Sequence, residues 1–225
     1  WYFSFMARNL CLQCQRPTNA CICAFVCEIN NKTPVLVLQH PSEVKQAKGT
    51  VALLQRSLIA CQVLVGEDFS ENTELNKILE QHQALLLYPS EQAQVLSSTA
   101  NTIENHSVER LENKPRLLII LDGTWRKAYR MFMLSTNLQA LNQVCLPDTL
   151  ANNGQYLIRK VAKKNALSSL EATCYALALL DGEIIDSELL DYTYENDKKI
   201  DCGAYQTLLN KFAQFNHFQL SFRKV

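Results

Sequence analysis

The sequence predicts an α/β fold built on a largely parallel sheet with helices on both faces. The central observation is the run Leu117–Leu121, five consecutive aliphatic residues, which is typical of a strand buried on both faces of a parallel sheet. Other short apolar runs alternate with helix-like segments, and this alternation favours parallel strands joined by right-handed crossovers. With 225 residues, of which 48% are hydrophobic, the chain can bury such a core.

The predicted elements follow one another along the whole chain. Strands are expected at residues 34–39, 61–65, 84–88, 117–121, 144–146 and 156–158. Helices are expected at residues 42–60, 72–81, 124–134, 168–181, 186–196 and 201–214, and the polar segment 91–114 is expected to form surface helix and loop. Ser168 and Glu171 have the spacing of a capping box at the start of a helix. We divide the chain into an arm, residues 1–33, and an α/β domain, residues 34–225.

The balance of charges limits how the chain could bind nucleic acid. Lys and Arg together number 22, as do Asp and Glu, so binding would have to use local basic patches rather than net charge. The candidate patches are Lys45, Lys48 and Arg56; Arg126, Lys127 and Arg130; and Lys160, Lys163 and Lys164. Lys45 and Lys48 would share one face of the predicted helix. Each group could equally be an ordinary solvated surface.

The sequence also bears on location. No apolar run approaches the roughly 20 residues that span a bilayer. The first six residues, Trp1–Met6, lack the basic region and the cleavage site of a signal peptide. We therefore expect a cytoplasmic protein without a membrane partner, and Met6 as its natural start.

Cysteines are concentrated near the start of the chain. Five of the nine lie between residues 11 and 27, and four of these follow the pattern Cys11-x2-Cys14-x6-Cys21-x-Cys23. In a reducing compartment such a cluster favours a metal over disulfides, and four thiolates suit a structural tetrahedral zinc. Cys27 could replace one ligand, or the arm could be loosely ordered with reduced thiols. The other four cysteines are expected in the core: Cys61, Cys145, Cys174 and Cys202.

The turn Asp122-Gly123-Thr124-Trp125 ends the central strand. In open α/β sheets, ligands bind outside the carboxyl ends of the strands, so a carboxylate, a hydroxyl and an indole at this position indicate a site. Other predicted strands end in His40-Pro41, Tyr88-Pro89 and Arg159-Lys160, and these groups would converge if the strands were neighbours. Alternatively, Asp122 only caps the next helix and Trp125 belongs to the core.

Four segments together resemble the DTW-domain family. They are the cysteine-rich segment 11–23, the turn His40–Glu43, the turn Asp122–Trp125, and Leu157–Lys160 followed by Leu167–Ala172. Their order and spacing match over most of the chain, from residue 11 to about residue 180. Members of this family are tRNA-uridine aminocarboxypropyltransferases related to the SPOUT class. The resemblance therefore implies a SPOUT-like domain with a C-terminal trefoil knot.

The resemblance also implies a reaction. The 3-amino-3-carboxypropyl group of S-adenosylmethionine would be transferred to N3 of a uridine in tRNA, and methylthioadenosine would be released. Asp122 would act either as the base or as the anchor for the ammonium group of the donor, and Thr124 and Trp125 would shape the catalytic pocket. Arg159 would pair with the donor carboxylate or with a tRNA phosphate.

The implied binding residues form two sets. The donor would be bound by Tyr88, Pro89, Leu121, Asp122, Gly123, Leu146, Arg159, Ser169 and Glu171. The tRNA would be bound by His40, Lys45, Lys48, Arg56, Arg126 and Lys160. Two of these residues have a simpler interpretation, because Glu171 could serve only the capping box and His40 could be an ordinary hydrogen-bonded residue at the end of a strand.

The chain departs from the family pattern at two positions. It has Gly49-Thr50 where the family usually has Asn-Thr, and Ser168-Ser169 where the family has Ser-Thr. Glycine inside the predicted helix costs roughly 1 kcal/mol relative to alanine, whereas Ser169 keeps a hydroxyl group. Two other functions fit the same features: an RNA methyltransferase of the SPOUT class, and a zinc-dependent RNA-binding module without catalysis.

Overall fold

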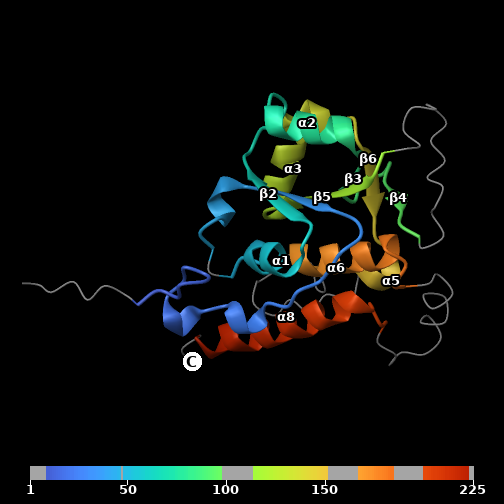
Figure 1. The fold of residues 1–225 in the computed structure, drawn as a ribbon. Coiled ribbons are helices and arrows are strands. Elements are labelled where there is room, and N and C mark those ends of the chain that lie inside the picture. The colour runs from blue at the N-terminus through green and yellow to red at the C-terminus, as the bar shows by residue number, and fades with distance from the viewer. Residues whose placement is uncertain (1–8, 47, 98–113, 152–166, 185–199, 223–225) are drawn as a thin grey trace, which may run out of the picture.

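The computed structural model describes residues 9–46, 48–97, 114–151, 167–184 and 200–222 (Figure 1). Within these residues the chain forms a six-stranded sheet with the order β2-β1-β5-β3-β6-β4, and every pairing is parallel. The strands are β1 (Val35–Gln39), β2 (Cys61–Val65), β3 (Gln83–Leu87), β4 (Gln94–Val95), β5 (Arg116–Asp122) and β6 (Asn142–Cys145). The predicted α/β class with a parallel sheet is confirmed.

Helices cover both faces of the sheet (Figure 1). One face carries α2 (Thr73–Gln81), α3 (Trp125–Leu134) and the short α4 (Thr136–Gln139). The other face carries α1 (Val51–Ser57) and α6 (Ser169–Leu180), and α8 (Ala204–Ser221) packs on the far side of α6. The short helix α5 (Asp148–Ala151) follows β6. The helices therefore enclose two apolar cores, one on each face.

The central strand β5 contributes to both cores. Leu118 and Ile120 point toward α6, whereas Leu117 and Ile119 join the core beneath α3. Successive side chains of a strand point to opposite faces, which is why an unbroken aliphatic run suits a strand covered on both sides. Each fully buried leucine or isoleucine contributes roughly 1.5–3 kcal/mol to folding. The expectation that residues 117–121 form a strand buried on both faces is confirmed.

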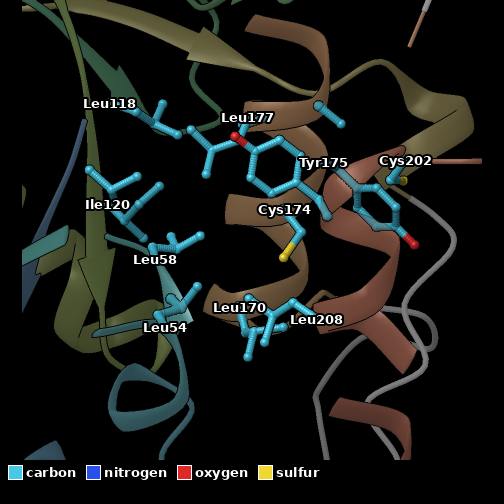
Figure 2. Close-up of a cluster of buried hydrophobic side chains, with 14 of the residues drawn as sticks. Leu54, Leu58, Leu118, Ile120, Leu170, Cys174, Tyr175, Leu177, Cys202 and Leu208 are labelled. Carbon is cyan, nitrogen blue, oxygen red and sulfur yellow. The ribbon is translucent and has the colours of Figure 1, made fainter. Parts of the chain in front are cut away.

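Two cysteines expected in the core are buried there. Cys174 of α6 and Cys202, which precedes α8, are both 0% exposed. Figure 2 shows Cys174 between the sheet residues Leu118 and Ile120 and the α8 residue Leu208. Burial raises the pKa of the Cys174 thiol well above its usual range, so this thiol is an apolar packing group. Cys61 and Cys145 are half-buried.

The helix predicted at residues 42–60 is wrong over its first half. Pro41–Glu43 form a single 3-10 turn, and α1 begins only at Val51. Gly49 lies at the break, and its amide closes a turn by donating to the carbonyl of Gln46 over 2.9 Å. Glycine disfavours helix, so the interruption falls where the sequence is weakest. Lys45 and Lys48 lie in the turns before α1, and the prediction that they share a helix face is wrong.

Other boundaries also differ from the prediction. The segment expected to be surface helix and loop contains the short strand β4, whose two residues are exposed and pair with the edge of β6. The helix expected at 201–214 runs from Ala204 to Ser221. The capping box of Ser168 and Glu171 is confirmed. The predicted strand at 156–158 and helix at 186–196 lie outside the described residues, and the trefoil knot and the SPOUT relationship remain predictions.

The arm packs against helices from distant parts of the sequence. The ring of Phe25 contacts the rings of Phe215 and Phe218 on α8, with centroids 5.7 and 5.2 Å apart. The ammonium group of Lys211 on α8 donates a hydrogen bond to the carbonyl oxygen of Ala24 over 3.0 Å. The boundary between arm and domain at residues 33 and 34 remains a prediction.

Asp181 joins three segments where α6 ends. Its carboxylate accepts hydrogen bonds from the amides of Lys32 and Thr33 and from the hydroxyl of Thr33. It also accepts a short hydrogen bond from the hydroxyl of Tyr205 on α8. Asp181 is half-buried, and these hydrogen bonds hold the junction of arm and domain together. Among the described residues, no helix is both long and apolar enough to cross a bilayer.

Candidate active site and metal centre

The polar strand ends identified in the sequence lie at one edge of the sheet. β1, β5, β3 and β6 are consecutive neighbours in the sheet order, so the residues that follow them share the carboxyl edge. His40, Tyr88, Asp122 and Leu146 end or follow these four strands. The expectation that these strands are neighbours is confirmed, and His40-Pro41, Tyr88-Pro89 and Asp122 follow or end strands at one edge of the sheet; their convergence on a single crevice remains a prediction. Arg159-Lys160 lie outside the described residues.

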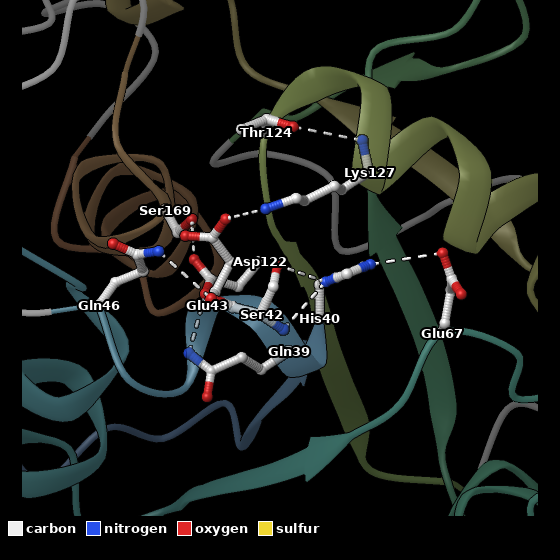
Figure 3. A network of polar contacts seen from close by, with 10 residues as sticks. All are labelled: Gln39, His40, Ser42, Glu43, Gln46, Glu67, Asp122, Thr124, Lys127 and Ser169. Carbon is white, nitrogen blue, oxygen red and sulfur yellow. Dashed lines mark hydrogen bonds and ion pairs between the residues drawn. The ribbon is translucent and has the colours of Figure 1, made fainter.

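Asp122 is a buried carboxylate with two fixed partners (Figure 3). It is 8% exposed and pairs in register with Gln39 on the neighbouring strand β1. The Gln39 amide nitrogen Nε2 donates to Oδ2 over 2.9 Å, and the hydroxyl of Ser169 donates to Oδ1 over 2.7 Å. Strand alternation explains the arrangement, because Asp122 has the same parity as Leu118 and Ile120 and therefore faces α6.

The start of α3 shows whether Asp122 caps that helix. Thr124 is the N-cap of α3, because its hydroxyl accepts a hydrogen bond from the amide of Lys127. The interpretation of Asp122 as the cap of this helix is therefore wrong. Ser169 is the first residue of α6, so the carboxylate lies at the start of that helix, where the helix dipole favours negative charge. Each carboxylate oxygen has a second lone pair, with which it can accept a proton or hold an ammonium group.

A second buried acid lies in the turn that follows β1 at the same edge of the sheet. Glu43, in the turn after β1, is 4% exposed, and its Oε1 lies 2.7 Å from the ammonium nitrogen of Lys127 on α3. This ion pair fastens the His40–Glu43 turn to the helix that begins just after Asp122 (Figure 3). Sequence reasoning assigned no role to Gln39 and used Glu43 only as part of the family-like turn His40–Glu43. The available signal for Gln39 was a polar residue at the end of an otherwise apolar strand.

The carboxylate of Glu171 is used locally. Its Oε2 accepts a hydrogen bond from the amide of Ser168 over 2.8 Å, and the hydroxyl of Ser168 accepts one from the amide of Glu171. The simpler interpretation of Glu171 as part of a capping box is therefore confirmed. A contact between Glu171 and a donor molecule remains a prediction.

His40 has a similar local role. Its Nδ1 accepts a hydrogen bond from the amide of Ser42, which caps the turn Pro41–Glu43. Its Nε2 lies 3.4 Å from Oε1 of Glu67, and the same oxygen lies 2.8 Å from Nε of Arg130. Because Nδ1 is an acceptor, the proton is assigned to Nε2. His40 thus connects the end of β1 to α3 through Glu67.

The turn after β5 separates its side chains. Asp122 is directed inward, whereas Trp125 is 57% exposed and Thr124 is also exposed. The interpretation of Trp125 as a core residue is therefore wrong. Gly123 allows the close approach of strand and helix, because a Cβ atom there would lie 3.0 Å from Cβ of Lys127.

The remaining residues predicted to bind S-adenosylmethionine occupy different environments at the same edge of the sheet. Tyr88 stacks on Phe132 of α3, with ring centroids 4.7 Å apart, and burial raises its pKa. Leu121 belongs to the core beneath α3, whereas Leu146 is half-buried and packs against the core on the α6 side. Pro89 is exposed. A donor contact for each of these residues remains a prediction.

The residues predicted to bind tRNA are also differently placed. Lys45 and Arg126 are exposed, and Lys48 is half-buried. Arg56, at the end of α1, donates from its guanidinium group to the carbonyl of Gln13 over 2.7 Å, so it supports the cysteine-rich loop. Lys160 lies outside the described residues. Binding of tRNA by any of these residues remains a prediction.

Four cysteines form a compact cluster in the arm. The sulfur atoms of Cys11, Cys14, Cys21 and Cys23 all lie within 4.8 Å of one another, with 3.8 Å between Cys11 and Cys23 and 3.7 Å between Cys14 and Cys21. Tetrahedral zinc with bonds of about 2.3 Å requires its sulfurs to be about 3.8 Å apart. The donor set and its geometry therefore fit zinc.

The protonation of the cluster is consistent with a cation site. Burial opposes ionisation of Cys14, but hydrogen bonds from the amides of Ile22 and Arg16 outweigh it and lower its pKa to about 6. Burial and the neighbouring thiols raise the pKa of Cys23 to about 12. Four adjacent thiols resist joint ionisation, so a bound cation is needed to make all of them thiolates. Cys27 is not part of the cluster, and its amide instead donates to the hydroxyl of Ser57.

Comparison with known proteins identifies the family. The model of the DTW domain matches residues 8–220. The chain belongs to the DTW-domain family. The matched range of this DTW-domain chain includes the cysteine cluster, the sheet and α8, so the match extends over both the arm and the α/β domain.

Several curated relatives of this DTW-domain chain are similar to it over most of its length. It is 32% identical over 181 residues to tRNA-uridine aminocarboxypropyltransferase 2 of Drosophila melanogaster, covering 77% of the chain and 67% of the relative. It is 32% identical over 180 residues to the protein of the same name from Macaca fascicularis, covering 77% and 57%. It is 28% identical over 217 residues to tRNA-uridine aminocarboxypropyltransferase A of Arabidopsis thaliana, covering 84% and 79%.

The animal relatives extend beyond the matched part. The alignment spans 67% of the Drosophila melanogaster protein and 57% of the Macaca fascicularis protein. No solved structure gives a significant match to this DTW-domain chain.

Proposed function

We propose that this protein transfers the 3-amino-3-carboxypropyl group of S-adenosylmethionine to N3 of a uridine in tRNA. The observation that carries the proposal is the buried carboxylate of Asp122, held by Gln39 and Ser169 at the carboxyl edge of the sheet. Open α/β sheets bind their ligands at this edge. The names of the curated relatives support the same reaction.

The proposed reaction is a substitution at carbon. Uridine N3 loses its proton, and its lone pair forms a bond to the γ-carbon of the aminocarboxypropyl chain. The bond from this carbon to the sulfonium breaks, and its electron pair stays on sulfur, which leaves as the neutral thioether of methylthioadenosine. Because the sulfonium already activates the carbon, the protein must mainly orient the reactants and remove the proton.

Asp122 is the residue proposed to take the uridine proton. Its two hydrogen bonds fix the orientation of the carboxylate. They therefore also fix the direction in which its remaining lone pairs can accept a proton. The competing role is to hold the ammonium group of the donor, which the same oxygens could also do. In both roles Gln39 and Ser169 are positioning residues, because they act through Asp122.

Positioning also selects the reacting carbon. The sulfonium of the donor has three carbon substituents, and a methyltransferase would present the methyl group instead. The donor is proposed to bind along the strand ends, near Tyr88, Gly123 and Leu146. Arg159 is proposed to pair with its carboxylate.

A structural zinc is proposed as the second component. Cys11, Cys14, Cys21 and Cys23 would hold it, and their distances fit a tetrahedral site. Four protein ligands close the coordination sphere, so the metal would supply a crosslink rather than chemistry. This crosslink would order the arm that packs on α8.

The decisive experiment is mass analysis of nucleosides from tRNA incubated with the purified protein and S-adenosylmethionine. The proposal expects one uridine nucleoside heavier by an aminocarboxypropyl group, together with stoichiometric methylthioadenosine. A nucleoside heavier by one methyl group would instead identify a methyltransferase. Binding of tRNA with neither product nor affinity for the donor would identify a non-catalytic RNA-binding module.

A further inference from the structure

The outer face of α3 carries an exposed stripe of large side chains. Trp125, Tyr129 and Met133, which we call the α3 stripe, are 57%, 57% and 51% exposed. They recur every four residues, so they lie on one side of the helix. Large apolar side chains gathered on one exposed face indicate a binding surface more often than chance exposure does.

The core does not explain the stripe. The opposite side of α3 supplies the packing, because Ala128 and Met131 are buried and Phe132 stacks on Tyr88. Trp125 and Tyr129 take part in no ring contact within the described residues. Their aromatic faces are therefore available to a ligand.

Positive charge accompanies the stripe. Arg126 and Arg130 follow Trp125 and Tyr129 directly in the sequence, and α3 contains no acidic residue. Arg130 is 66% exposed and pairs at the surface with Glu67, while Lys127 on the adjacent side pairs with Glu43. Arg126 is exposed and makes no hydrogen bond or ion pair with its side chain in the described part of the chain. The face therefore combines aromatic rings with an available cation.

The stripe begins at the candidate active site. Trp125 follows Asp122 by three residues, at the carboxyl edge of the central strand. Tyr129 lies one turn further along the same helix. A ligand on the stripe would therefore extend away from the strand ends along α3.

The spacing of the rings suits flat ligands. Residues four apart are displaced by about 6 Å along a helix axis. A nucleobase stacked between two rings needs about 7 Å between them, twice the roughly 3.4 Å rise of stacked bases. Small side-chain rotations cover the difference between these two distances.

We propose that the α3 stripe binds unpaired nucleotides beside the reacting uridine, with bases stacked on Trp125 and Tyr129 and a phosphate on Arg126. This proposal rests on the proposed RNA substrate and names the part of it that is recognised. Aromatic stacking platforms combined with cations are typical of single-strand binding, whereas the bases of a duplex are hidden within the stack. A second copy of the chain fits less well, because a two-fold contact through α3 would oppose arginine to arginine.

The chain offers a direct spectroscopic test. It contains two tryptophans, Trp1 and Trp125, so Trp1→Phe leaves Trp125 as the only indole reporter. A uridine-containing single-stranded RNA should quench this fluorescence, and the same strand annealed to its complement should not. Tyr129→Ala should weaken single-strand binding by about 5-fold to 150-fold, the effect of losing one stacked base.

Two matched variants complete the test. Arg126→Ala should reduce the slope of log affinity against log salt by about 0.7 for the single strand, the contribution of one phosphate. Phe222→Ala removes an aromatic ring that is 50% exposed at the end of α8 and should leave RNA binding unchanged. Thermal melts of all variants check that the fold is retained.

Three results would overturn the proposal: equal quenching by the duplex, equal loss of binding in Phe222→Ala, or a dimer that Tyr129→Ala dissociates. The assay needs neither donor nor transfer, so it is separate from the test of the proposed function. Quenching of Trp125 fluorescence without aminocarboxypropyl transfer would support RNA binding at the α3 stripe and contradict the proposed reaction. If Tyr129→Ala still transferred the group and bound single-stranded RNA with wild-type affinity, the proposed reaction would stand and RNA binding at the α3 stripe would be contradicted.

Discussion

The hydroxyl of Ser169 donates a hydrogen bond to Oδ1 of Asp122 over 2.7 Å, although 47 positions separate the two residues in the sequence. The contact joins the end of β5 to the first residue of α6, and Gln39 completes it from β1. Three elements therefore orient one carboxylate. A small change in the start of α6 would redirect the group on which the proposed reaction depends.

Asp122→Asn tests the proposed base. The side-chain carbonyl can still accept from Gln39, and the amide can donate to the hydroxyl of Ser169, which also accepts hydrogen bonds. The fold and the melting temperature should therefore change little. Single-turnover transfer should slow by roughly 10²–10⁴-fold, the usual contribution of general base catalysis.

The same variant separates the two roles of Asp122. If the carboxylate anchors the donor ammonium, titration with S-adenosylmethionine should show binding weaker by roughly 1–3 kcal/mol. If it is the base, donor affinity should remain. Wild-type turnover in the variant would remove Asp122 from the mechanism.

Ser169→Ala and Ser169→Thr test whether Ser169 positions Asp122. Removing the hydroxyl leaves Oδ1 without this hydrogen bond, and we expect a loss of stability of about 1 kcal/mol together with slower transfer. If Asp122 is the base, the affinity for S-adenosylmethionine should not change; if Asp122 anchors the ammonium group, this affinity should fall as well. Threonine keeps the hydroxyl and should restore the rate. If both variants transferred at the wild-type rate, the hydrogen bond would have no part in catalysis.

Metal analysis tests the cysteine cluster. The purified protein should contain one equivalent of zinc per chain, and Cys14→Ser should lose it. Proteolysis within the arm should then accelerate while the α/β domain keeps its melting transition, because the arm has little core of its own. Cys145→Ser is the matched control, since this half-buried thiol lies outside the cluster. Native protein without metal and with the four clustered thiols, Cys11, Cys14, Cys21 and Cys23, freely titratable would contradict the assignment.

Salt dependence tests the local basic patches. Each phosphate contact contributes roughly 0.7–0.9 units to the slope of log affinity against log salt. Lys45→Ala combined with Arg126→Ala should therefore flatten the slope for tRNA by about 1.5 units. Lys114 lies before β5, at the opposite end of the sheet, and Lys114→Ala should leave the slope unchanged. An unaltered slope in the double variant would place both residues away from the RNA.

The features that the sequence predicts well are local. The aliphatic run Leu117–Leu121 needs only its own residues to indicate a buried strand, and the capping box of Ser168 and Glu171 is set by a three-residue spacing. The start of α1 was predicted wrongly. Residues 42–60 are compatible with a helix as a whole, but Pro41 begins a turn and Gly49 disfavours helix, so the helix starts only at Val51.

The detail of the site depends on distant pairings that no local pattern contains. Gln39 meets Asp122 because β1 and β5 are adjacent, and their sequence order does not reveal this. Lys127 could be recognised as basic, but its pairing with Glu43 follows from how α3 packs over the turn. The sequence therefore located the edge of the sheet that carries the site, but not the partners that orient its carboxylates.

The contact between Lys211 and Ala24 has a consequence for biosynthesis. These residues are 187 positions apart, and the ribosome produces the N-terminal residue first. The cysteine cluster spans only 13 residues, from Cys11 to Cys23, so the proposed zinc could be bound soon after the cluster emerges from the ribosome. The surface on α8 that receives it is made near the end of translation. Until α8 has been made, the arm lacks the surface on which it packs, and the ring of Phe25 lacks its partners Phe215 and Phe218.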